Sequence, residues 1–413
     1  MHIILFRYSP RAVMLNNLSK ENTLVIAPDS QMEKYDKFLS QGYTVPKVLF
    51  LSDYSLPNIV LELRKIQNKE IIQSITTLSE DDMSWTGILH DHFVEDNTVS
   101  VSNVLFKDKY LMRSLLVGVV EQPYFRLLSN LSEYYLFWET TNSDIAVIKP
   151  RFGAGSLDVI TVYRDAEISS VPKKYISDNF LIEEFIAEKN MMTCDGYSIG
   201  NNIIRFFSHE YDELILESFE STKEIVCRTS SLYSLDKEFL WIVFQECRKV
   251  LSLFSVKGEL TPFHFEWFYC LEDRKVYFCE VGKRFGGVSI PFLINYSFNM
   301  DILKEYWELL VSEEKRDVSD IKYIEQIPIP RVISSNYSPY RRGGIIKSMP
   351  SIEEFGWTKN TWIFVQKGMK TEKARTIIES LFVTEFISEN ETDYRDNLKN
   401  LRTLTNMFEY EEE

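Results

Sequence analysis

A pair of β-rich segments joined by a short polar turn constrains the fold of this chain more than any other feature. The segments run over Phe263–Cys270 and Val276–Val281, and the sequence between them is LEDRK. Strand-forming residues on both sides of such a turn predict a β-hairpin. A turn centred on Asp273 would place Cys270 opposite Val276 and would set the register of every pair beyond it.

Two carboxylates fall on one face of this predicted hairpin, because counting outward from the turn places Glu266 directly across from Glu280. Opposed Cβ atoms are about 5 Å apart, and two unit charges at that distance repel by roughly 3 kcal/mol at an effective dielectric of about 20. A divalent cation would offset the repulsion, since Mg²⁺ prefers carboxylate oxygen and leaves other positions for phosphates and water. His264 shares the face, and the aromatic residues of FHFEW lie on the other. The alternatives are an exposed face with two unrelated acids and a register shifted by one residue.

The segment after Glu280 adds a cation and paired glycines. Arg284 follows Glu280 by four residues, and Gly286 and Gly287 follow Arg284 after one intervening residue. An arginine beside glycines that let the backbone approach a ligand suits a site that handles anionic oxygen. The alternative is that Lys283 and Arg284 are simply two charged residues in a surface turn.

A lysine and a glycine-rich loop form a candidate phosphate site earlier in the chain. Lys149 ends the β-rich segment IAVIKP, and Gly153, Gly155 and Ser156 follow it. An ammonium group next to a loop rich in free N–H groups can cradle phosphate. The loop is neither a P-loop nor a dinucleotide-binding turn, because GxxxxGK[ST] and the third glycine of GxGxxG are absent and a β-rich stretch follows. A glycine hairpin that folds over phosphates is the structure that this pattern predicts.

The segment FLIEEFI places Glu183 and Glu184 between apolar residues. An edge strand explains this pattern, and so does a hinge whose backbone groups and acids recognise an adenine amino group. The five histidines are scattered without HExxH spacing, and no GxSxG or Cys/His signature is present. The sequence therefore disfavours hydrolases of those types.

Composition excludes several classes of protein. The 413 residues carry 46 Lys and Arg against 61 Asp and Glu, a formal charge of −15, and such a surface repels nucleic acid. The five cysteines form no CxxC pair, which favours reduced thiols in a cytoplasm. The start MHIILFRYSP is too short in apolar residues for a signal peptide, and no apolar stretch approaches the roughly 20 residues of a membrane span. We expect a soluble cytoplasmic protein that binds neither nucleic acid nor membrane.

Changes in pattern along the chain predict an α/β protein of three domains. Residues 1–105 alternate β-rich runs with helix-compatible stretches, which predicts a βαβ domain on a largely parallel sheet. Residues 106–326 form a mixed central domain, in which we expect the segment ELILESF to continue the β-rich section. Residues 327–413 predict a small β-containing domain with an acidic tail.

The segment KDKYLMRSLL, near the start of the central domain, predicts a helix. Its apolar residues Tyr110, Leu111 and Leu115 recur near helical spacing, and its basic residues lie on the other side.

Taken in order, seven segments resemble the successive motifs of the ATP-grasp superfamily: KDK, VIKP, RFGAGS, IEEFI, MTCDGYSIGNN, FHFEWF and EVGKRFGG. The resemblance covers about residues 107–295. It implies an N-terminal βαβ domain, a central two-lobed ATP-grasp domain and a small C-terminal β-containing domain. It also implies a ligase that activates a carboxylate with ATP and Mg²⁺, for which Mn²⁺ is an alternative.

The resemblance implies roles for residues that match its motifs. Lys109 and Lys149 would contact ATP phosphates, and Arg284 would stabilise the transferred phosphate. The remaining assignments are the phosphate-covering loop at Gly153, Gly155 and Ser156; the adenine site at Glu183, Glu184 and Ile186; the metal ligands Glu266 and Glu280; and substrate contacts at His264, Gly286 and Gly287.

Two positions depart from the superfamily pattern. Gly282 stands where an asparagine ligand is usual, so a second Mg²⁺ would depend on Glu280, phosphate oxygens and water. Met191 stands where a glutamate is usual, so the side chain that the pattern would use to recognise ribose is absent.

Within the superfamily, GYSIGNN together with HxE and ExxxRxGG is most similar to amino-acid ligases of peptide and antibiotic biosynthesis. The pattern is also similar to the ligase that loads glutamate onto an acyl-carrier protein in butirosin assembly.

The implied partners are an amino-acid substrate and an acceptor, either an amine or a carrier-protein thiol. Carrier proteins are commonly acidic, so the charge of −15 disfavours that acceptor unless a basic patch such as Arg341 and Arg342 serves. A catalytically dead ATP-binding protein and a kinase that stops at the acyl phosphate are further alternatives.

Overall fold

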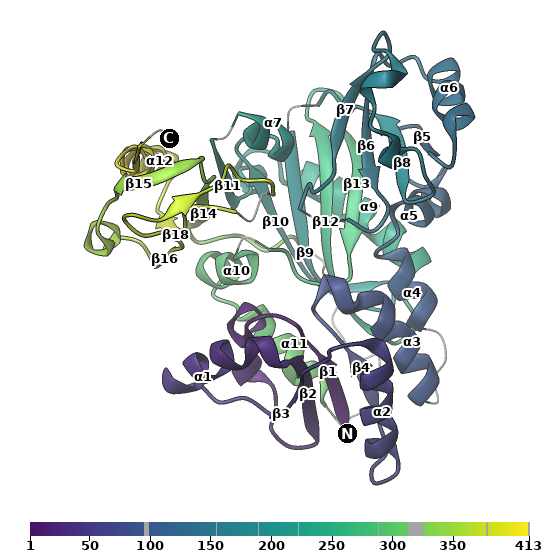
Figure 1. Ribbon diagram of the computed structural model, residues 1–413, viewed down its shortest axis with the longest axis vertical. Coiled ribbons are helices and arrows are strands. Elements are labelled where there is room, and N and C mark those ends of the chain that lie inside the picture. The colour runs from purple at the N-terminus through teal and green to yellow at the C-terminus, as the bar shows by residue number, and fades with distance from the viewer. Residues whose placement is uncertain are drawn as a thin grey trace.

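The computed structural model describes residues 1–94, 99–153, 155–188, 190–221, 223–287, 289–312, 324, 326–376 and 379–411. Figure 1 shows an N-terminal domain at the bottom, a large sheet in the middle that continues into the C-terminal strands, and a small lobe at the upper right. Among the described residues, no helix combines the length and the apolar character that a membrane span requires.

The N-terminal domain is built on a four-stranded parallel sheet of order β3-β2-β1-β4. Its elements are β1 (His2–Leu5), β2 (Thr23–Pro28), α1 (Met32–Ser40), β3 (Lys47–Leu51), α2 (Leu56–Gln67), β4 (Ser74–Thr76), α3 (Met83–Phe93) and α4 (Val99–Leu105). Parallel neighbours need crossover connections; α1 lies between β2 and β3, and two short 3-10 helices, Pro10–Val13 and Leu15–Asn17, lie between β1 and β2. The prediction of a βαβ domain is therefore confirmed.

An eight-stranded antiparallel sheet forms the centre of the molecule, in the order β13-β12-β9-β10-β11-β14-β18-β16. Its strands are β9 (Asn190–Ile199), β10 (Asn202–Tyr211), β11 (Glu224–Thr229), β12 (Leu260–Cys270), β13 (Lys275–Gly282), β14 (Ile333–Pro339), β16 (Asn360–Ile363) and β18 (Phe382–Ser388). The helices around it are α5 (Lys109–Leu116), α7 (Ile215–Glu220), α8 (Leu232–Leu235), α9 (Lys237–Phe254), α10 (Ile290–Phe298) and α11 (Ile302–Leu310).

Each face of the large sheet has its own core. One core joins α9 to the inward residues of β12, among them Phe263, Phe265 and Trp267. The other joins α10 and α11 to the opposite face and to side chains of the N-terminal domain such as Phe6. The N-terminal domain and the large sheet are thus packed together by apolar contacts rather than connected only through the chain.

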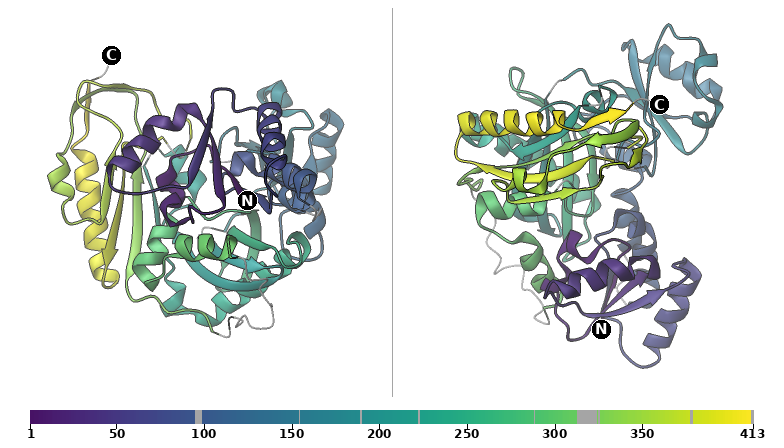
Figure 2. Two further views of the ribbon diagram at one scale, coloured as in Figure 1. Left: turned by 90° about the horizontal axis from the view of Figure 1, so that it is seen from below. Right: turned by 60° about the vertical axis from the view of Figure 1, so that its left-hand side comes forward.

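The small lobe is a four-stranded antiparallel sheet of order β5-β8-β6-β7, covered by an α-helix. Its elements are β5 (Phe125–Leu127), α6 (Leu131–Thr140), β6 (Ile145–Pro150), β7 (Ile160–Tyr163) and β8 (Phe180–Glu184). Its own core lies between α6 and the sheet. Figure 2 shows this lobe projecting from the rest of the molecule.

The C-terminal segment extends the large sheet, because β14 pairs antiparallel with β11. It adds β15 (Gly344–Ser348), β17 (Lys370–Thr371) and β19 (Glu409–Glu411), which form a three-stranded sheet, and α12 (Glu391–Asn406). The predicted α/β class, with a βαβ domain, a two-lobed centre and a C-terminal β-containing part, is confirmed. The boundaries at residues 105 and 326 stay predictions.

One local prediction is wrong. The segment ELILESF was expected to be β-rich, but residues 215–220 form the helix α7. The adjacent apolar pair Leu214 and Ile215 is buried in the core beside Tyr211, while Ser218 donates a hydrogen bond to the carbonyl of Ile215. A short apolar run does not distinguish a strand from a helix, and here tertiary packing decides.

Candidate functional site

The predicted hairpin is present and pairs Glu266 directly with Glu280, but its turn and its register differ from the prediction. Cys270 pairs with Lys275 rather than with Val276, so the turn is one residue tighter than expected. The register then shifts between Trp267 and Glu266, because Cys279 is an extra residue that forms a β-bulge. The bulge cancels the error in the turn and returns Glu280 to its position opposite Glu266.

The two faces of β12 are divided as the alternation predicts. Phe263, Phe265 and Trp267 are fully buried in the core beneath α9. His264 and Glu266 point to the other face, where the His264 Nε2 atom lies 3.6 Å from Glu266 Oε1. The hydroxyl of Tyr211 on β10 donates to the same oxygen at 3.4 Å.

Lys109 lies against Glu280, with 3.1 Å between its Nζ atom and Glu280 Oε2. The same ammonium group donates to the carbonyl oxygen of Gly153 at 2.7 Å. Burial works against the charge of Glu280, but the ammonium groups of Lys109 and Lys149 outweigh it and hold the pKa of Glu280 below its ordinary value. The structure therefore brings together the first lysine, the glycine loop and one of the paired acids.

Glu266 and Glu280 suit a hard divalent cation in their chemistry. They are opposed carboxylates, and two such groups are the usual protein contribution to a Mg²⁺ site that also uses phosphates and water. Among the described residues, no group of three or more His, Cys, Asp or Glu side chains is arranged to hold a metal ion. A metal here would thus depend on these two acids and on oxygens of a bound nucleotide.

His264 is held from behind by a buried aspartate. Its Nδ1 atom lies 2.9 Å from Asp195 Oδ1, and the backbone N–H of Gly286 donates to that same oxygen at 2.7 Å. The Thr193 hydroxyl donates to Asp195 Oδ2 at 2.9 Å. Burial lowers the pKa of His264, but the Asp195 carboxylate outweighs it and raises that pKa to about 10. A charged, oriented imidazolium therefore lies beside Glu266.

Gly286 is required by this arrangement. A Cβ atom there would lie 2.7 Å from both Asp195 Oδ1 and His264 Nδ1, closer than real Cβ contacts occur. Gly287 differs, because a Cβ atom at that position meets no atom within 4 Å. Of the predicted glycine pair, only the first is fixed by close packing.

Arg284 is held by a residue of the N-terminal domain. Its Nε and Nη2 atoms lie 2.7 and 2.5 Å from Glu80 Oε2, and Lys107 Nζ lies 2.8 Å from Glu80 Oε1. Burial raises the pKa of Glu80, but the charges of Arg284 and Lys107 outweigh it and lower that pKa strongly. The site is thus built from the N-terminal domain as well as from the large sheet.

Lys149, at the end of β6, forms a buried ion pair with Glu183 on β8, with 2.6 Å between Nζ and Oε1. Arg113 on α5 contacts the other oxygen of Glu183, with its Nε atom 2.6 Å from Oε2. One carboxylate therefore connects the small lobe to the helix that also carries Lys109.

The two predicted adenine-site glutamates point to opposite sides of β8, as consecutive strand residues do. The Glu184 carboxylate accepts hydrogen bonds from the Thr141 hydroxyl and from the backbone N–H of Tyr124 at 3.2 Å, inside the small lobe. Ile186 lies just beyond β8 and is half-buried. The carboxylate of Glu183 therefore faces the cations Lys149 and Arg113, and the carboxylate of Glu184 does not.

The antiparallel pairing of β6 with β7 confirms the predicted hairpin, while the covering of phosphates by its loop stays a prediction. In the loop between them, Gly155 and Ser156 have φ angles of 64° and 58°, in the left-handed region. A Cβ atom at Gly153 would lie 2.3 Å from the Pro150 side chain. Two glycines of the loop are therefore needed for its shape.

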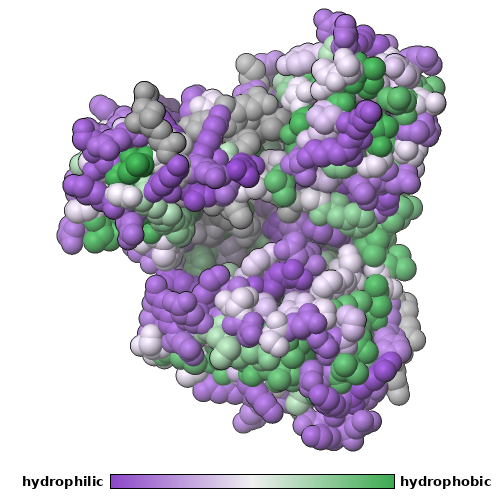
Figure 3. Space-filling view, in the orientation of Figure 1, coloured by the Kyte–Doolittle hydropathy of each residue, from purple (hydrophilic) through white to green (hydrophobic). Residues whose placement is uncertain are grey.

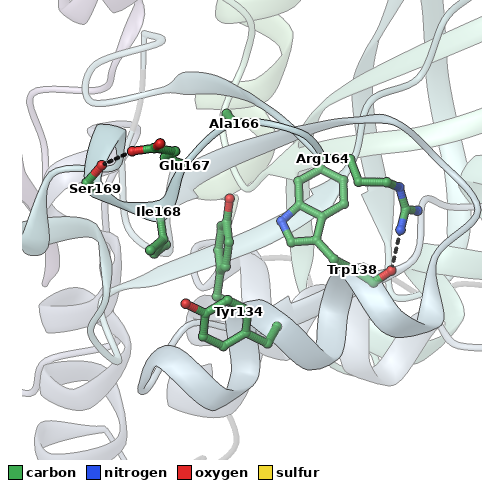
Figure 4. A pocket seen from close by; sticks show the side chains of 8 residues that line it. Tyr134, Trp138, Arg164, Ala166, Glu167, Ile168 and Ser169 are labelled. Atoms are coloured by element: carbon green, nitrogen blue, oxygen red, sulfur yellow. Dashed lines mark hydrogen bonds between the residues drawn. The ribbon is translucent and has the colours of Figure 1, made fainter.

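The face shown in Figure 3 is hollowed between the N-terminal domain below and the large sheet above. A separate pocket of about 480 Å³ lies on the small lobe, lined by Tyr134, Trp138 and Arg164 among others (Figure 4). The Arg164 guanidinium is already used there, since it donates to the carbonyl oxygens of Trp138, Thr141 and Ser143. This pocket shares no residue with the predicted site.

Comparison with solved structures identifies the fold. An L-amino acid ligase from Bacillus licheniformis is similar over 100% of this chain and 98% of its own, with a TM-score of 0.74 and 15% identity. The N5-carboxyaminoimidazole ribonucleotide synthetase of Thermus thermophilus covers 98% of both chains, with a TM-score of 0.67 and 12% identity. The chain has the ATP-grasp fold.

A third ATP-grasp structure was solved with its nucleotide. The carboxyaminoimidazole ribonucleotide synthase of Aspergillus clavatus, complexed with ATP, covers 99% of both chains, with a TM-score of 0.67 and 13% identity. In contrast to these structural matches, no protein-family model matches the sequence. A search of curated proteins gives no significant match.

Sequence reasoning missed several residues of the site: Glu80, Arg113, Asp195 and Tyr211. The buried face of α5 also differs from the predicted one, because Met112 and Leu116 are buried beside the cations. Arg113 is only 1% exposed, whereas Leu111 and Leu115 are 37% and 51% exposed. Asp195 had a visible signal, because an acid in the middle of an apolar strand requires a buried partner. Glu80 had none, since its partners lie far away in the sequence.

Proposed function

We propose that this protein is an ATP-dependent ligase that activates the carboxylate of an amino acid as an acyl phosphate and transfers it to an amine. Peptide or antibiotic biosynthesis is the setting that the sequence resemblance favours. The observation that carries the proposal is the assembly of paired acids and cations in one site. Glu266 faces Glu280, and Lys109 contacts Glu280 at 3.1 Å. Arg284 joins them from the turn after β13.

The proposed chemistry has two displacements. A carboxylate oxygen of the first substrate attacks the γ-phosphorus of ATP, the bond from that phosphorus to the β,γ-bridging oxygen breaks, and ADP leaves. The amine nitrogen then attacks the acyl carbon, the bond from that carbon to the phosphate oxygen breaks, and inorganic phosphate leaves. The nitrogen loses its proton, and an amide remains.

The residues of the chain serve this chemistry mainly by positioning and by neutralising charge. Lys109 and Lys149 would bind phosphate oxygens, and the loop of Gly153 and Gly155 would cover them. Arg284 would stabilise negative charge on the transferred phosphoryl group. His264, held by Asp195, would contact the carboxylate substrate.

Glu266 and Glu280 would hold Mg²⁺, which supplies charge neutralisation at the phosphates and orients them. In the protein alone, Lys109 partly balances Glu280, and His264 and Tyr211 lie against Glu266. The adenine would lie at β8, where Glu183 faces the site and the backbone near Ile186 follows. The ATP complex of the structural neighbour from Aspergillus clavatus supports nucleotide binding on this fold.

The experiment that tests the proposal is ATP-dependent phosphate release with a panel of amino acids supplied in pairs, with mass spectrometry of the products. Hydroxylamine included in parallel would convert an acyl phosphate into a hydroxamate. We expect phosphate release that requires both a carboxylate substrate and an amine, with a product mass equal to the pair minus water. Turnover without either substrate, or none with any pair, would count against the proposal.

A matched pair of variants separates the site from general effects of substitution. Glu266→Gln removes one proposed metal ligand, whereas Glu272→Gln changes an exposed acid in the turn of the same hairpin. We expect the first to lose most turnover and the second to retain it.

A carrier protein is the alternative acceptor. An increase in its mass after incubation with enzyme, ATP and glutamate would shift the assignment from amine to thiol.

A further inference from the structure

The helix α5 presents two cations to one short stretch of β13. Lys109 and Arg113 are four residues apart, so they lie on the same face of the helix. Lys109 contacts Glu280, and the Nη1 and Nη2 atoms of Arg113 donate to the carbonyl oxygens of Phe278 and Cys279, each at 3.1 Å. The helix therefore contacts three consecutive residues, and these are the residues that form the bulge and the acid after it.

The bulge needs such support because of its place in the sheet. β13 is the edge strand of the sheet, so within the described part of the chain its outer side has no neighbouring strand to pair with. Cys279 has no partner in the register between β12 and β13. A planar guanidinium that donates to both carbonyls fixes their direction, which a single ammonium group cannot do. Phe278 is held from the same side, because its N–H donates to the carbonyl oxygen of Glu121 at 2.8 Å.

Arg113 also holds the acid that orients the second lysine. Its Nε atom lies 2.6 Å from Glu183 Oε2, and Lys149 lies 2.6 Å from Glu183 Oε1. The Arg113 side chain is 1% exposed, so these contacts are made without competing water. One guanidinium thus connects the bulge of the large sheet to the ion pair of the small lobe.

We propose that Arg113 is a positioning residue that sets Glu280 in register with Glu266 and aligns Lys149 through Glu183. This inference goes beyond the proposed function and rests on its metal and nucleotide site. The physical reason is the period of a strand. If the bulge relaxed by one residue, the Glu280 side chain would turn to the opposite face of the sheet. A site that needs two carboxylates on one face would then lose one of them.

The test compares the affinity for ADP with and without Mg²⁺, measured by isothermal titration calorimetry on the full-length protein. In Arg113→Met the bulge loses both donors while an apolar stem fills the space. We expect the gain in ADP affinity on adding Mg²⁺ to fall by about 10-fold to 100-fold, the usual effect of losing a residue that orients metal ligands.

Arg113→Lys keeps a charge for Glu183 but cannot reach both carbonyls and the carboxylate together. We expect the lysine variant to keep the ADP affinity of the wild type in the absence of Mg²⁺ and to lack the gain in affinity on adding Mg²⁺. This split between the two affinities would not follow from a merely structural role. If the methionine variant does not fold, the lysine variant carries the test by itself.

The matched control is Arg228→Met, because Arg228 is also buried in the large sheet and paired with acids, Glu391 and Glu210, away from this site. It should lower the melting temperature and leave the Mg²⁺-dependent gain unchanged. If the wild type shows the gain and both Arg113 variants keep it in full, the proposal for Arg113 is overturned while the proposed function stands. If the wild type itself shows no gain from Mg²⁺, the metal site is wrong and both proposals are overturned.

Discussion

Glu80 binds Arg284 through a single oxygen, with the Nε and Nη2 atoms of the guanidinium at 2.7 and 2.5 Å. The acid belongs to a 3-10 helix of the N-terminal domain, and the arginine follows the last strand of the hairpin that carries the paired acids. The remaining terminal nitrogen, Nη1, donates to the carbonyl of Phe285 at 3.0 Å. The direction of the proposed catalytic guanidinium is therefore set jointly by two domains.

Replacing Glu80 with glutamine should reduce turnover by about tenfold or more and leave ADP affinity within about twofold. The amide keeps the size of the side chain but removes the charge that holds Arg284, and a tenfold loss corresponds to roughly 1.4 kcal/mol of transition-state stabilisation. Steady-state phosphate release and calorimetry would measure the two quantities. Glu62→Gln, at the exposed pair with Lys65, is the matched control. Equal turnover in both variants would show that Glu80 does not orient the arginine.

The same pair predicts how stability depends on pH. Burial opposes the charge of Glu80, but Arg284 and Lys107 outweigh it, so its folded pKa lies below the unfolded value of about 4.3. A lowered folded pKa stabilises the native state above the unfolded pKa, and this contribution is lost as pH falls toward the folded pKa. The difference in unfolding free energy between wild type and Glu80→Gln should therefore be constant from about pH 8 to 5 and shrink below about pH 4. Urea titrations at each pH would measure it. A difference that stayed constant through that acid range would contradict the assignment.

The glutamates of β8 should have unequal effects, because their side chains lie on opposite sides of the strand. Glu183→Gln weakens the pairs with Lys149 and Arg113, so we expect ADP affinity to fall by about tenfold. Glu184→Gln alters contacts inside the small lobe, to Thr141 and Tyr124, and should lower the melting temperature with little change in affinity. Calorimetry and thermal melts on both variants would decide. The reverse order of effects would place the adenine site on the other side of β8.

The hairpin shows which part of the site was predictable from sequence. Alternation placed His264 and Glu266 on one face and the aromatic residues on the other, because that pattern follows directly from the period of a strand. The register of Glu280 was correct only because two errors cancelled. The turn is one residue tighter than predicted, and the bulge at Cys279 adds that residue back. Nothing in a single sequence marks a bulge at a cysteine between Phe278 and Glu280.

Other parts of the site were hidden because they depend on long-range pairing. Arg113 was placed with the basic, outward side of its helix, yet it is buried, since carbonyl oxygens and Glu183 compensate its charge. Lys109 follows the same rule against Glu280. Met112 and Leu116 are also buried on α5, so its buried face combines apolar contacts with ion pairs, and apolar periodicity alone does not show which cations lie on it. Glu80 could not be assigned for the same reason, because its partner Arg284 is about 200 residues away in the chain.

Removing the guanidinium of Arg284 should affect the chemical step more than binding. Loss of one contact to developing negative charge typically costs about 3 to 4 kcal/mol, so Arg284→Ala should lower kcat by a factor of roughly a hundred or more. The KM for ATP should change much less, because Lys109 and Lys149 remain. Initial rates across a range of ATP concentrations would separate the two constants. Unchanged kcat would remove Arg284 from the proposed mechanism.

Gly282 offers a way to test the proposed metal site, because it stands where the ATP-grasp motif that this segment resembles usually has an asparagine. It pairs with His264 across the hairpin, so a side chain there would point to the same face as Glu266 and Glu280. The atoms nearest to a Cβ at Gly282 would be those of the Arg284 side chain, at ordinary contact distances of 3.5 to 3.9 Å, and the φ of Gly282 is not left-handed. An asparagine at this position is therefore sterically acceptable.

We expect Gly282→Asn to fold normally and to lower the Mg²⁺ concentration needed for half-maximal phosphate release, because its amide oxygen adds a hard ligand beside the two carboxylates. Gly286→Ala is the contrasting variant. Its new methyl group would lie 2.6 Å from Ile290 Cδ1 and 2.7 Å from His264 Nδ1, so it should disturb His264 and lose turnover although it is the smaller change. Mg²⁺ titrations of phosphate release, with thermal melts of both variants, would measure these effects. An unchanged or higher Mg²⁺ requirement in a stably folded asparagine variant would mean that the metal does not lie on this face of the hairpin.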